Sequence, residues 1–174
     1  MPEVRTARMR LVSGTQELAE AELADSARLS RLLGATLTAE WPPETLRDAL
    51  PVFLSRGRVS GNFGPWTLGW YGILEEAGKA VLCGSIGFKG APNLDGMVEI
   101  GYAVLPGYQG RGIATEMVQA LCHWAFRQSG VREVQAEVSP QNPASLRVLA
   151  KAGFAPLSQN PEIGMQRFYL FHAA

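Results

Sequence analysis

Apolar residues recur along the chain at two spacings, and each spacing predicts a different kind of element. Runs rich in β-branched and aromatic residues, bounded by glycine or proline, indicate strands. The predicted strands cover residues 8–13, 66–76, 80–88, 97–105, 131–138, 154–157 and 165–171. Turn residues at 77–79 join the second and third of them into a hairpin.

Apolar positions three and four residues apart predict four helices. The first is expected to begin after Thr15, a good N-cap, and to run to Gly34. The second opens at the Trp-Pro-Pro-Glu segment 41–44, and Pro51 is expected to break it. The other two cover residues 114–125, the clearest apolar stripe in the chain, and 142–152.

The order of elements, β-α-α-β-β-β-α-β-α-β-β, predicts an α/β (α+β) architecture. We expect a mixed, mainly antiparallel central sheet of six to seven strands, flanked by about four helices. The helix at 114–125 connects strand 97–105 to strand 132–138 as a crossover, so these two strands are expected to be parallel. The length favours a single domain over residues 1–174.

Composition narrows the class of protein without identifying it. Sixteen basic residues balance sixteen acidic ones, which argues against a dedicated nucleic-acid binder. Cys83 and Cys122 lie in apolar runs and are expected to be buried thiols, and no cysteine–histidine spacing indicates a metal site. Without an apolar leader segment or a run long enough to span a bilayer, we expect a cytoplasmic protein with no membrane partner.

A glycine-rich turn between strand 97–105 and the next helix has the chemistry of an anion site. Gly107, Gly110 and Gly112 let the backbone approach a ligand closely, and the first amides of the helix have no partner within it. The positive end of the helix dipole adds to the attraction for phosphate. The turn lacks the Gly-Lys-Ser/Thr ending of a Walker loop and fits the dinucleotide fingerprint poorly. By itself, a tight strand-to-helix turn is the better explanation of such glycines.

Three segments in order resemble the GNAT superfamily of acetyltransferases. Residues 109–114 (Gln-Gly-Arg-Gly-Ile-Ala) match its Gln/Arg-x-x-Gly-x-Gly/Ala motif. Residues 98–104 (Val-Glu-Ile-Gly-Tyr-Ala-Val) resemble the strand before it, and residues 142–154 resemble the helix and strand after it. The strand and the later helix are most similar to the ribosomal-protein N-terminal acetyltransferase (Rim-type) branch. The resemblance covers about residues 80–155 and implies a parallel strand pair that splays apart.

The resemblance implies acetyl-coenzyme A as cosubstrate and a set of binding residues, with no metal. Backbone groups at the end of strand 97–105 would pair with the pantetheine arm, the glycine loop would hold the pyrophosphate, and two residues of the later helix would contact the arm. For Asn142, helix capping before Pro143 is an equal alternative, and both roles are compatible. The implied cofactor-binding residues are Ala103, Val104, Leu105, Gln109, Gly110, Arg111, Gly112, Ile113, Ala114, Asn142 and Ser145.

Acetyl transfer to an amine requires a base, because the amine is mostly ammonium at neutral pH, and an acid for the leaving thiolate. Glu99 is the candidate base, since it is a lone charge on its strand and shares a face with Gly101 and Ala103. The alternative is a structural carboxylate. Many family members have a tyrosine where this chain has Leu149, so Ser145 is the nearest candidate acid, with Tyr102 a weaker one. A backbone amide near Val104 or Leu105 is expected to stabilise the oxyanion.

The sequence therefore predicts an N-acetyltransferase that joins acetyl-coenzyme A and a primary amine, a protein N-terminus or a small molecule, in a ternary complex. A non-catalytic acyl-coenzyme A sensor and a transferase of longer acyl groups remain alternatives. The acceptor is expected between the N-terminal helices and the last hairpin, beside the loop 156–164 and an aromatic surface formed by Trp41, Phe53, Phe63 and Trp66. Core packing also explains most of these four aromatic residues. The resemblance also allows a homodimer.

Overall fold

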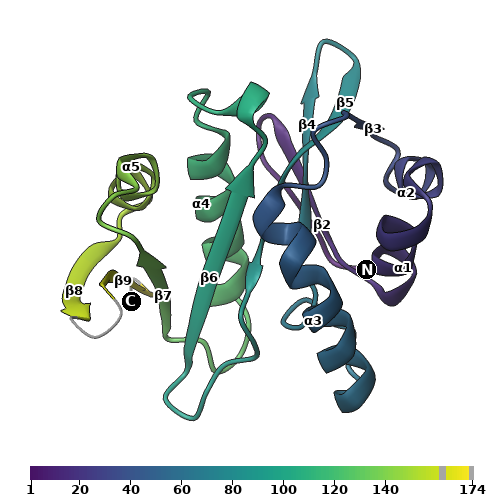
Figure 1. The fold of residues 1–174 in the computed structure, drawn as a ribbon. Helices are drawn as coiled ribbons and strands as arrows, with labels where there is room; N and C mark the ends of the chain where they lie inside the picture. Colours follow the sequence, from purple (N-terminus) through teal and green to yellow (C-terminus); the bar gives the residue numbers. More distant parts are fainter. Residues whose placement is uncertain (161–163, 173–174) are drawn as a thin grey trace.

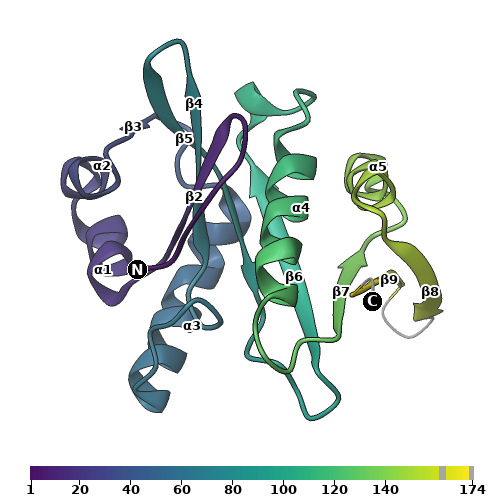
Figure 2. The ribbon, with the colours of Figure 1, turned by 180° about the vertical axis from the view of Figure 1, so that it is seen from behind.

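The computed structural model describes residues 1–160 and 164–172, which form a twisted sheet with helices on both faces (Figures 1 and 2). The strands are β1 Glu3–Arg5, β2 Met9–Ser13, β3 Thr36–Leu37, β4 Trp70–Glu76, β5 Lys79–Phe88, β6 Met97–Val104, β7 Glu133–Val138, β8 Ala155–Asn160 and β9 Met165–Phe171. The helices are α1 Gln16–Ala24, α2 Ser26–Leu33, α3 Glu44–Ser60, α4 Ile113–Phe126 and α5 Pro143–Ala152, with a short 3-10 turn η1 Pro106–Tyr108.

The strands form one nine-stranded sheet in the order β1-β2-β4-β5-β6-β7-β9-β8, with β3 pairing beside β5. Neighbouring strands are antiparallel, except for the parallel pairs β3–β5 and β6–β7. The fold class and the parallel crossover pair are confirmed. The sheet is wider than expected because the very short strands β1 and β3 carry too few residues to show a periodic pattern.

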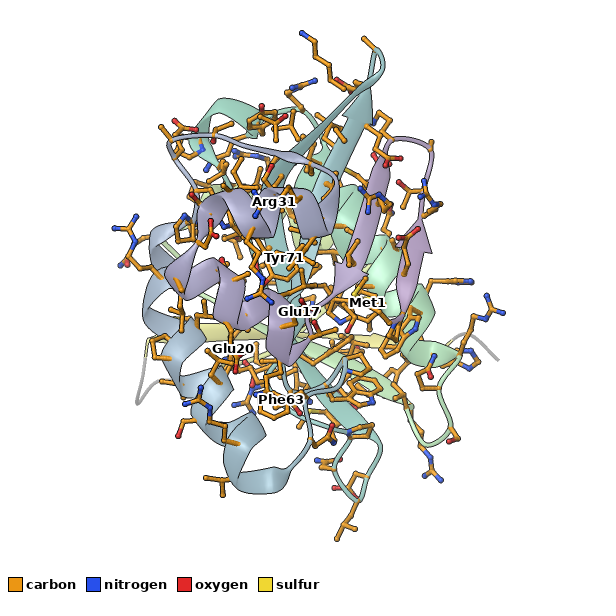
Figure 3. All side chains as sticks on the ribbon, turned by 90° about the vertical axis from the view of Figure 1, so that its right-hand side faces the viewer. Met1, Glu17, Glu20, Arg31, Phe63 and Tyr71 are labelled. Carbon is orange, nitrogen blue, oxygen red and sulfur yellow. The ribbon has the colours of Figure 1, made fainter. Side chains whose placement is uncertain are left out.

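Alternation along the strands divides the core between the two faces of the sheet. Val98 and Ile100 of β6 pack with Met117, Leu121 and other residues of α4 in one cluster, which also contains Leu149 of α5. The opposite face is covered by α1, α2 and α3; Figure 3 looks onto α1 and α2, beneath which Tyr71 of β4 packs against Leu29 and Leu33. Glu99, Gly101 and Ala103 alternate with Val98 and Ile100 and therefore face this second side.

The single helix expected before Gly34 is two helices that meet at Asp25. The Asp25 amide donates to Ala21 O and ends α1, while its carboxylate accepts from Arg28 N at 2.9 Å and caps α2. An aspartate competes well with helical bonding because its side chain bonds nearby amides. The two short helices can thus follow the curved sheet, and the prediction of one continuous helix was wrong.

Two further boundaries differ from those expected. Helix α3 continues through Pro51, because Leu50 and Leu54 on either side of it pack with Ala19 and Leu68 in a common cluster. The strand expected from residue 66 begins at Trp70, and the preceding residues form turns in which Thr67 N and Leu68 N both donate to Gly64 O. Packing across the chain, which local patterns do not contain, decides both cases.

Candidate active site

Strands β6 and β7 pair over three residues and then separate. The last pair is Glu99 with Gln135, although β6 continues to Val104. Between the separating strands, the start of α4 and the side of α5 lies a cavity of about 620 Å³. The splayed parallel pair implied by the sequence is therefore present.

Hydrogen bonding to β5 determines which backbone groups of β6 face this gap. Lys89 N donates to Glu99 O at 2.9 Å, and Leu105 N donates to Cys83 O at 2.9 Å. Because antiparallel pairing uses alternate residues, the backbone groups of residues 99, 101, 103 and 105 face β5. Those of Tyr102 and Val104 face the gap, and Val104 O accepts from Gln109 Nε2 at 3.0 Å.

The glycine loop has backbone angles that explain its composition. Gly110 has φ 74° and Gly112, the N-cap of α4, has φ 78°, both in the region that favours glycine. Glu116 N donates to Gly112 O as the first bond of the helix, so the amides of residues 113–115 precede the helical ladder. Gln109 N is bonded to Pro106 O, and the free run of amides therefore starts at Gly110.

Four charged side chains hold this loop in place, and of these only Arg111 was predicted from the sequence. Arg8 Nη2 donates to Glu116 Oε2 at 2.7 Å and to Arg111 O at 3.2 Å. Arg111 Nη2 in turn pairs with Glu76 Oε2 at 2.6 Å. Burial raises the pKa of Glu116, but hydrogen bonds from Thr6 and Arg8 outweigh it and leave the pKa below its usual value.

Helix α5 supplies the other wall of the cavity. Asn142 Oδ1 accepts from Ser145 N at 3.0 Å, so the capping role considered for Asn142 is present, and the same residue lines the cavity. Ser145 lines it as well, and its carbonyl accepts from Tyr102 Oη at 3.3 Å. Two exposed cations of α5, Arg147 and Lys151, stand at the wall and were not predicted from the sequence.

Most of the residues implied for cofactor binding meet at this cavity. Those that line it are Ala103, Val104, Gln109, Gly110, Gly112, Ile113, Ala114, Asn142 and Ser145. Leu105 does not, since its side chain is fully buried and its amide already bonds Cys83. Its amide is thus unavailable to an oxyanion, which leaves that of Val104. The side chain of Arg111 turns away to Glu76.

Glu99 lies where the two strands part, on the face of the sheet opposite α4. Its Oε1 is in ion-pair contact with Lys89 Nζ and receives no hydrogen bond of ordinary geometry from the described part of the chain. Beside it, a Cβ placed on Gly101 would find no atom within 4 Å. An open space therefore separates the Glu99 carboxylate from Ala103 at the cavity wall.

Nucleophiles and proton donors are limited near this space. Burial raises the pKa of the Cys83 thiol to about 11 and that of Cys122 to about 12, so both remain protonated at neutral pH and are poor nucleophiles. Leu149 is fully buried in the core. Burial also raises the pKa of Tyr102, whose hydroxyl already donates to Ser145 O.

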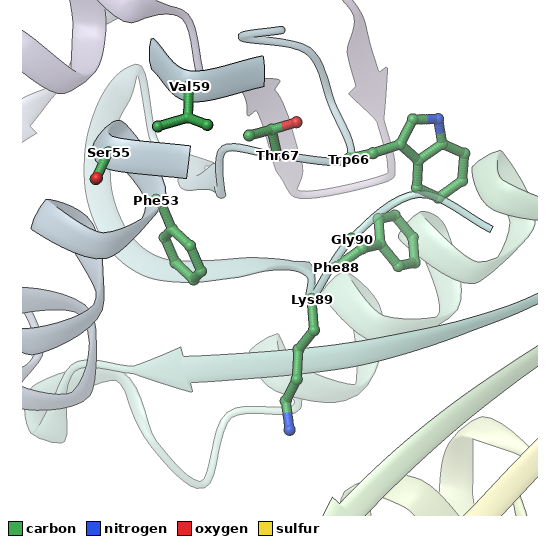
Figure 4. Close-up of a pocket in the computed structure, with 8 residues that line it drawn as sticks. All are labelled: Phe53, Ser55, Val59, Trp66, Thr67, Phe88, Lys89 and Gly90. Atoms are coloured by element: carbon green, nitrogen blue, oxygen red, sulfur yellow. The ribbon is translucent and has the colours of Figure 1, made fainter. Parts of the chain in front are cut away.

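A second cavity, of about 400 Å³, lies beside Lys89 and is lined by residues of α3, of the turn before β4 and of the end of β5 (Figure 4). Of the aromatic residues expected near the acceptor, Phe53 and Trp66 line it. Phe63 packs against Gly57 instead, and Trp41 donates to Glu22 Oε1 at 3.0 Å. Of the loop 156–164, residues 161–163 lie outside the described residues.

The splayed strands, the glycine loop with its helix N-terminus and a carboxylate beside open space define a class of protein that binds an extended, phosphate-bearing ligand next to a potential base. No group of three potential metal ligands occurs within residues 1–160 and 164–172. In the same part of the chain, no helix is long and apolar enough to cross a membrane.

Comparison with known proteins identifies the family. A family model described as an acetyltransferase (GNAT) domain matches residues 16–155, and the chain belongs to this family. YjdG of Bacillus subtilis (strain 168), an uncharacterised N-acetyltransferase, is 28% identical over 154 residues, 87% of this chain and 88% of YjdG. MnaT of Escherichia coli (strain K12), an L-amino acid N-acyltransferase, is 31% identical over 101 residues, 56% of this chain and 58% of MnaT.

Among solved structures, the L7/L12 alpha-N-protein acetyltransferase RimL in complex with coenzyme A has a TM-score of 0.62. The match covers 98% of each chain at 15% identity, which shows a shared fold. The chain is thus an N-acetyltransferase of the GNAT family, an enzyme that transfers an acetyl group from acetyl-coenzyme A to an amine.

Proposed function

We propose that the cavity between β6 and α5 binds acetyl-coenzyme A and that a primary amine attacks it from the α3 face of the sheet. The open position at Gly101 carries this proposal, because it lies on one face of β6 between Glu99 and Ala103, a residue of the cavity wall. The residues present fit the cosubstrate. The gap offers backbone groups of Tyr102 and Val104 to the pantetheine amides, and the amides of 110–114 suit a pyrophosphate.

The transfer step needs no enzyme nucleophile. Glu99 takes a proton from the ammonium, the amine nitrogen bonds the thioester carbonyl carbon, and the C–S bond breaks. The Val104 amide would stabilise the negative charge on the carbonyl oxygen. We propose that the nitrogen passes its second proton to the Ser145 hydroxyl while that hydroxyl gives its own proton to the leaving thiolate, so that the serine ends neutral and the thiol departs. Arg147 and Lys151 are placed to attract the remaining phosphate of the cosubstrate.

Membership of the family establishes acetyl transfer to an amine but does not identify which amine is the acceptor. We propose that the chain belongs to the Rim-type branch, because the Glu-Ile-Gly-Tyr segment and the helix at 142–152 resemble it. Membership of this branch does not by itself name a substrate. A sensor without turnover is favoured by Leu149, which cannot donate a proton, and disfavoured by Glu99. A longer acyl group differs only in the depth of pocket it needs.

The proposal is tested by following thiol release from acetyl-coenzyme A with a panel of amines and N-terminal peptides. We expect Glu99→Gln to lower turnover by about 100-fold or more while cofactor binding is unchanged. The matched control is Glu75→Gln, which likewise removes a carboxylate paired with a cation, here Arg10 Nε at 2.8 Å, but lies on β4, away from Gly101. Full turnover in Glu99→Gln would exclude Glu99 as the base.

A further inference from the structure

We propose that the acceptor is a free α-amino acid with a large apolar side chain, bound as a zwitterion between Lys89 and Glu99. The inference rests on the proposed function and specifies its substrate class. Three observations carry it, namely the ion pair at the acceptor face, the second cavity beside that pair, and the open space over Gly101.

The Lys89–Glu99 pair is built into the sheet. Lys89 N donates to Glu99 O across the end of β5, so the two residues are cross-strand neighbours with side chains on one face. The Lys89 side chain is 57% exposed and that of Glu99 is 25% exposed. The paired oxygen, Glu99 Oε1, is buried, so leaving it without a cation would be costly, and a second cation must take the place of Lys89 when the exposed lysine moves to another anion.

A zwitterion matches the two charges of this pair. Its carboxylate can take Lys89 from Glu99, and its ammonium can replace Lys89 as the partner of Glu99. The exchange frees Glu99 from its fixed cation and places the ammonium proton against the proposed base. An amine without a carboxylate would displace Lys89 from Glu99 and leave the lysine ammonium without an anionic partner.

The second cavity can hold the apolar side chain of the acceptor. Phe53 and Val59 of α3 line it together with Trp66 and Phe88, whose rings are 4.7 Å apart, and Lys89 forms part of the same wall. Figure 4 shows these side chains around the space. Its volume of about 400 Å³ is at the small end of ligand sites and suits one amino acid better than a peptide.

The test compares L-phenylalanine, L-phenylalanine amide and glycine as acceptors in the thiol-release assay. We expect kcat/KM for L-phenylalanine to exceed that for the amide by about 10-fold or more, the value of a charge-assisted contact. It should also exceed that for glycine by about 10-fold or more, because glycine has no apolar side chain to bury. In Lys89→Met, kcat/KM for L-phenylalanine should fall by about 10- to 100-fold. The amide should lose nothing or gain, because Glu99 is released. Lys79→Met, an exposed lysine at the β4–β5 turn, is the matched control.

The apolar cavity is tested separately with two exposed valines of α3. Val59, 87% exposed, lines the cavity, whereas Val52, 47% exposed, does not. Val59→Asp should raise KM for L-phenylalanine and leave that for glycine unchanged, and Val52→Asp should change neither. Both substitutions introduce the same residue into the same helix, so a loss common to both would indicate a folding effect and count against the cavity.

The outcomes separate this inference from the proposed function. If an N-terminal peptide or a simple amine is acetylated and L-phenylalanine is not, or if Lys89→Met affects L-phenylalanine and its amide equally, zwitterion recognition is wrong and the acetyltransferase stands. If acetyl-coenzyme A binds and no acceptor reacts, the amino-acid inference is overturned too. If acetyl-coenzyme A fails to bind, the proposed function itself fails.

Discussion

At the scale of single residues, the open space beside Glu99 depends on the glycine at position 101, which has no side chain to fill it. Gly101 lies in β6 between Glu99 and Ala103, and no atom lies within 4 Å of where its Cβ would stand. We expect Gly101→Val to fold normally, because valine suits a strand. It should nevertheless lower turnover by about 100-fold by displacing the reacting groups. Thermal unfolding and acetyl-coenzyme A binding, measured beside the turnover, would show whether stability or cofactor affinity is lost instead.

Glu22 is a residue whose ionisation should act on stability. Its carboxylate accepts from Tyr71 Oη at 2.7 Å and from Trp41 Nε1, and burial raises its pKa above the usual 4.5 in spite of these hydrogen bonds. A raised pKa means that the folded state holds the proton more tightly than the unfolded state. The stabilising contribution is therefore full below pH 4.5 and declines as the pH rises through the folded-state pKa.

Glu22→Gln should remove this decline, because an amide remains neutral and can still accept from Tyr71. We expect the free energy of unfolding of the variant, relative to the unmodified protein, to increase from pH 5 to pH 8 in urea denaturation. Glu17→Gln, on the same helix and exposed, provides the baseline. A constant difference over this range would show that burial of Glu22 does not shift its ionisation.

At the scale of elements, the N-terminal segment before β2 fixes the start of α4. Arg8 holds Glu116 in the first turn of that helix and the carbonyl of Arg111 in the glycine loop. Arg8→Met should loosen the loop and raise the Kd for acetyl-coenzyme A by about 10-fold, the value of one charge-assisted hydrogen bond. Arg5→Met, which removes an exposed pair with Glu75, should leave the Kd unchanged in calorimetry.

The elements that the sequence predicted well are those whose signals are local. The apolar stripe of α4, the capping of α5 by Asn142 and the glycines before α4 each act within a few residues. The elements it missed depend on distant partners. Strand β3 exists as two residues beside β5, and α3 continues through Pro51 because of its packing.

The residues of the candidate site also fall into those with a local signal in the sequence and those whose contacts depend on distant partners. The glycine loop and Glu99 were identifiable because motif and strand pattern place them next to each other. Lys89 was not, because its pairing with Glu99 follows from the register of β5 against β6. Arg8 lies 103 residues from the loop it holds, and nothing in its neighbourhood signals that contact. The exclusion of Leu105 also needed the register, which directs its amide to Cys83.

At the scale of the whole molecule, the sheet consists of two parts that meet over a short parallel seam. The strands from β1 to β6 form one part, and β7, β9 and β8 form the other. The pairs from Met97 to Glu99 join them, and α4 and α5 cover the same face with a continuous cluster of buried residues. The cavity thus lies beyond the end of the seam, where β6 continues without a partner strand and α4 and α5 supply the other walls.

This seam has a consequence for how the protein avoids unwanted association. Unpaired backbone in a β-protein normally lies on an outer strand, where a second chain can add to it and begin aggregation. Here the unpaired stretch of β6 lies inside the strand order, with β5 on one side and α4 and α5 beside the opening. A second chain could pair with this stretch only by entering the cavity, and could not simply add to it as it would to an outer strand. The fold thus retains unpaired strand backbone for a ligand without placing it at the edge of the sheet.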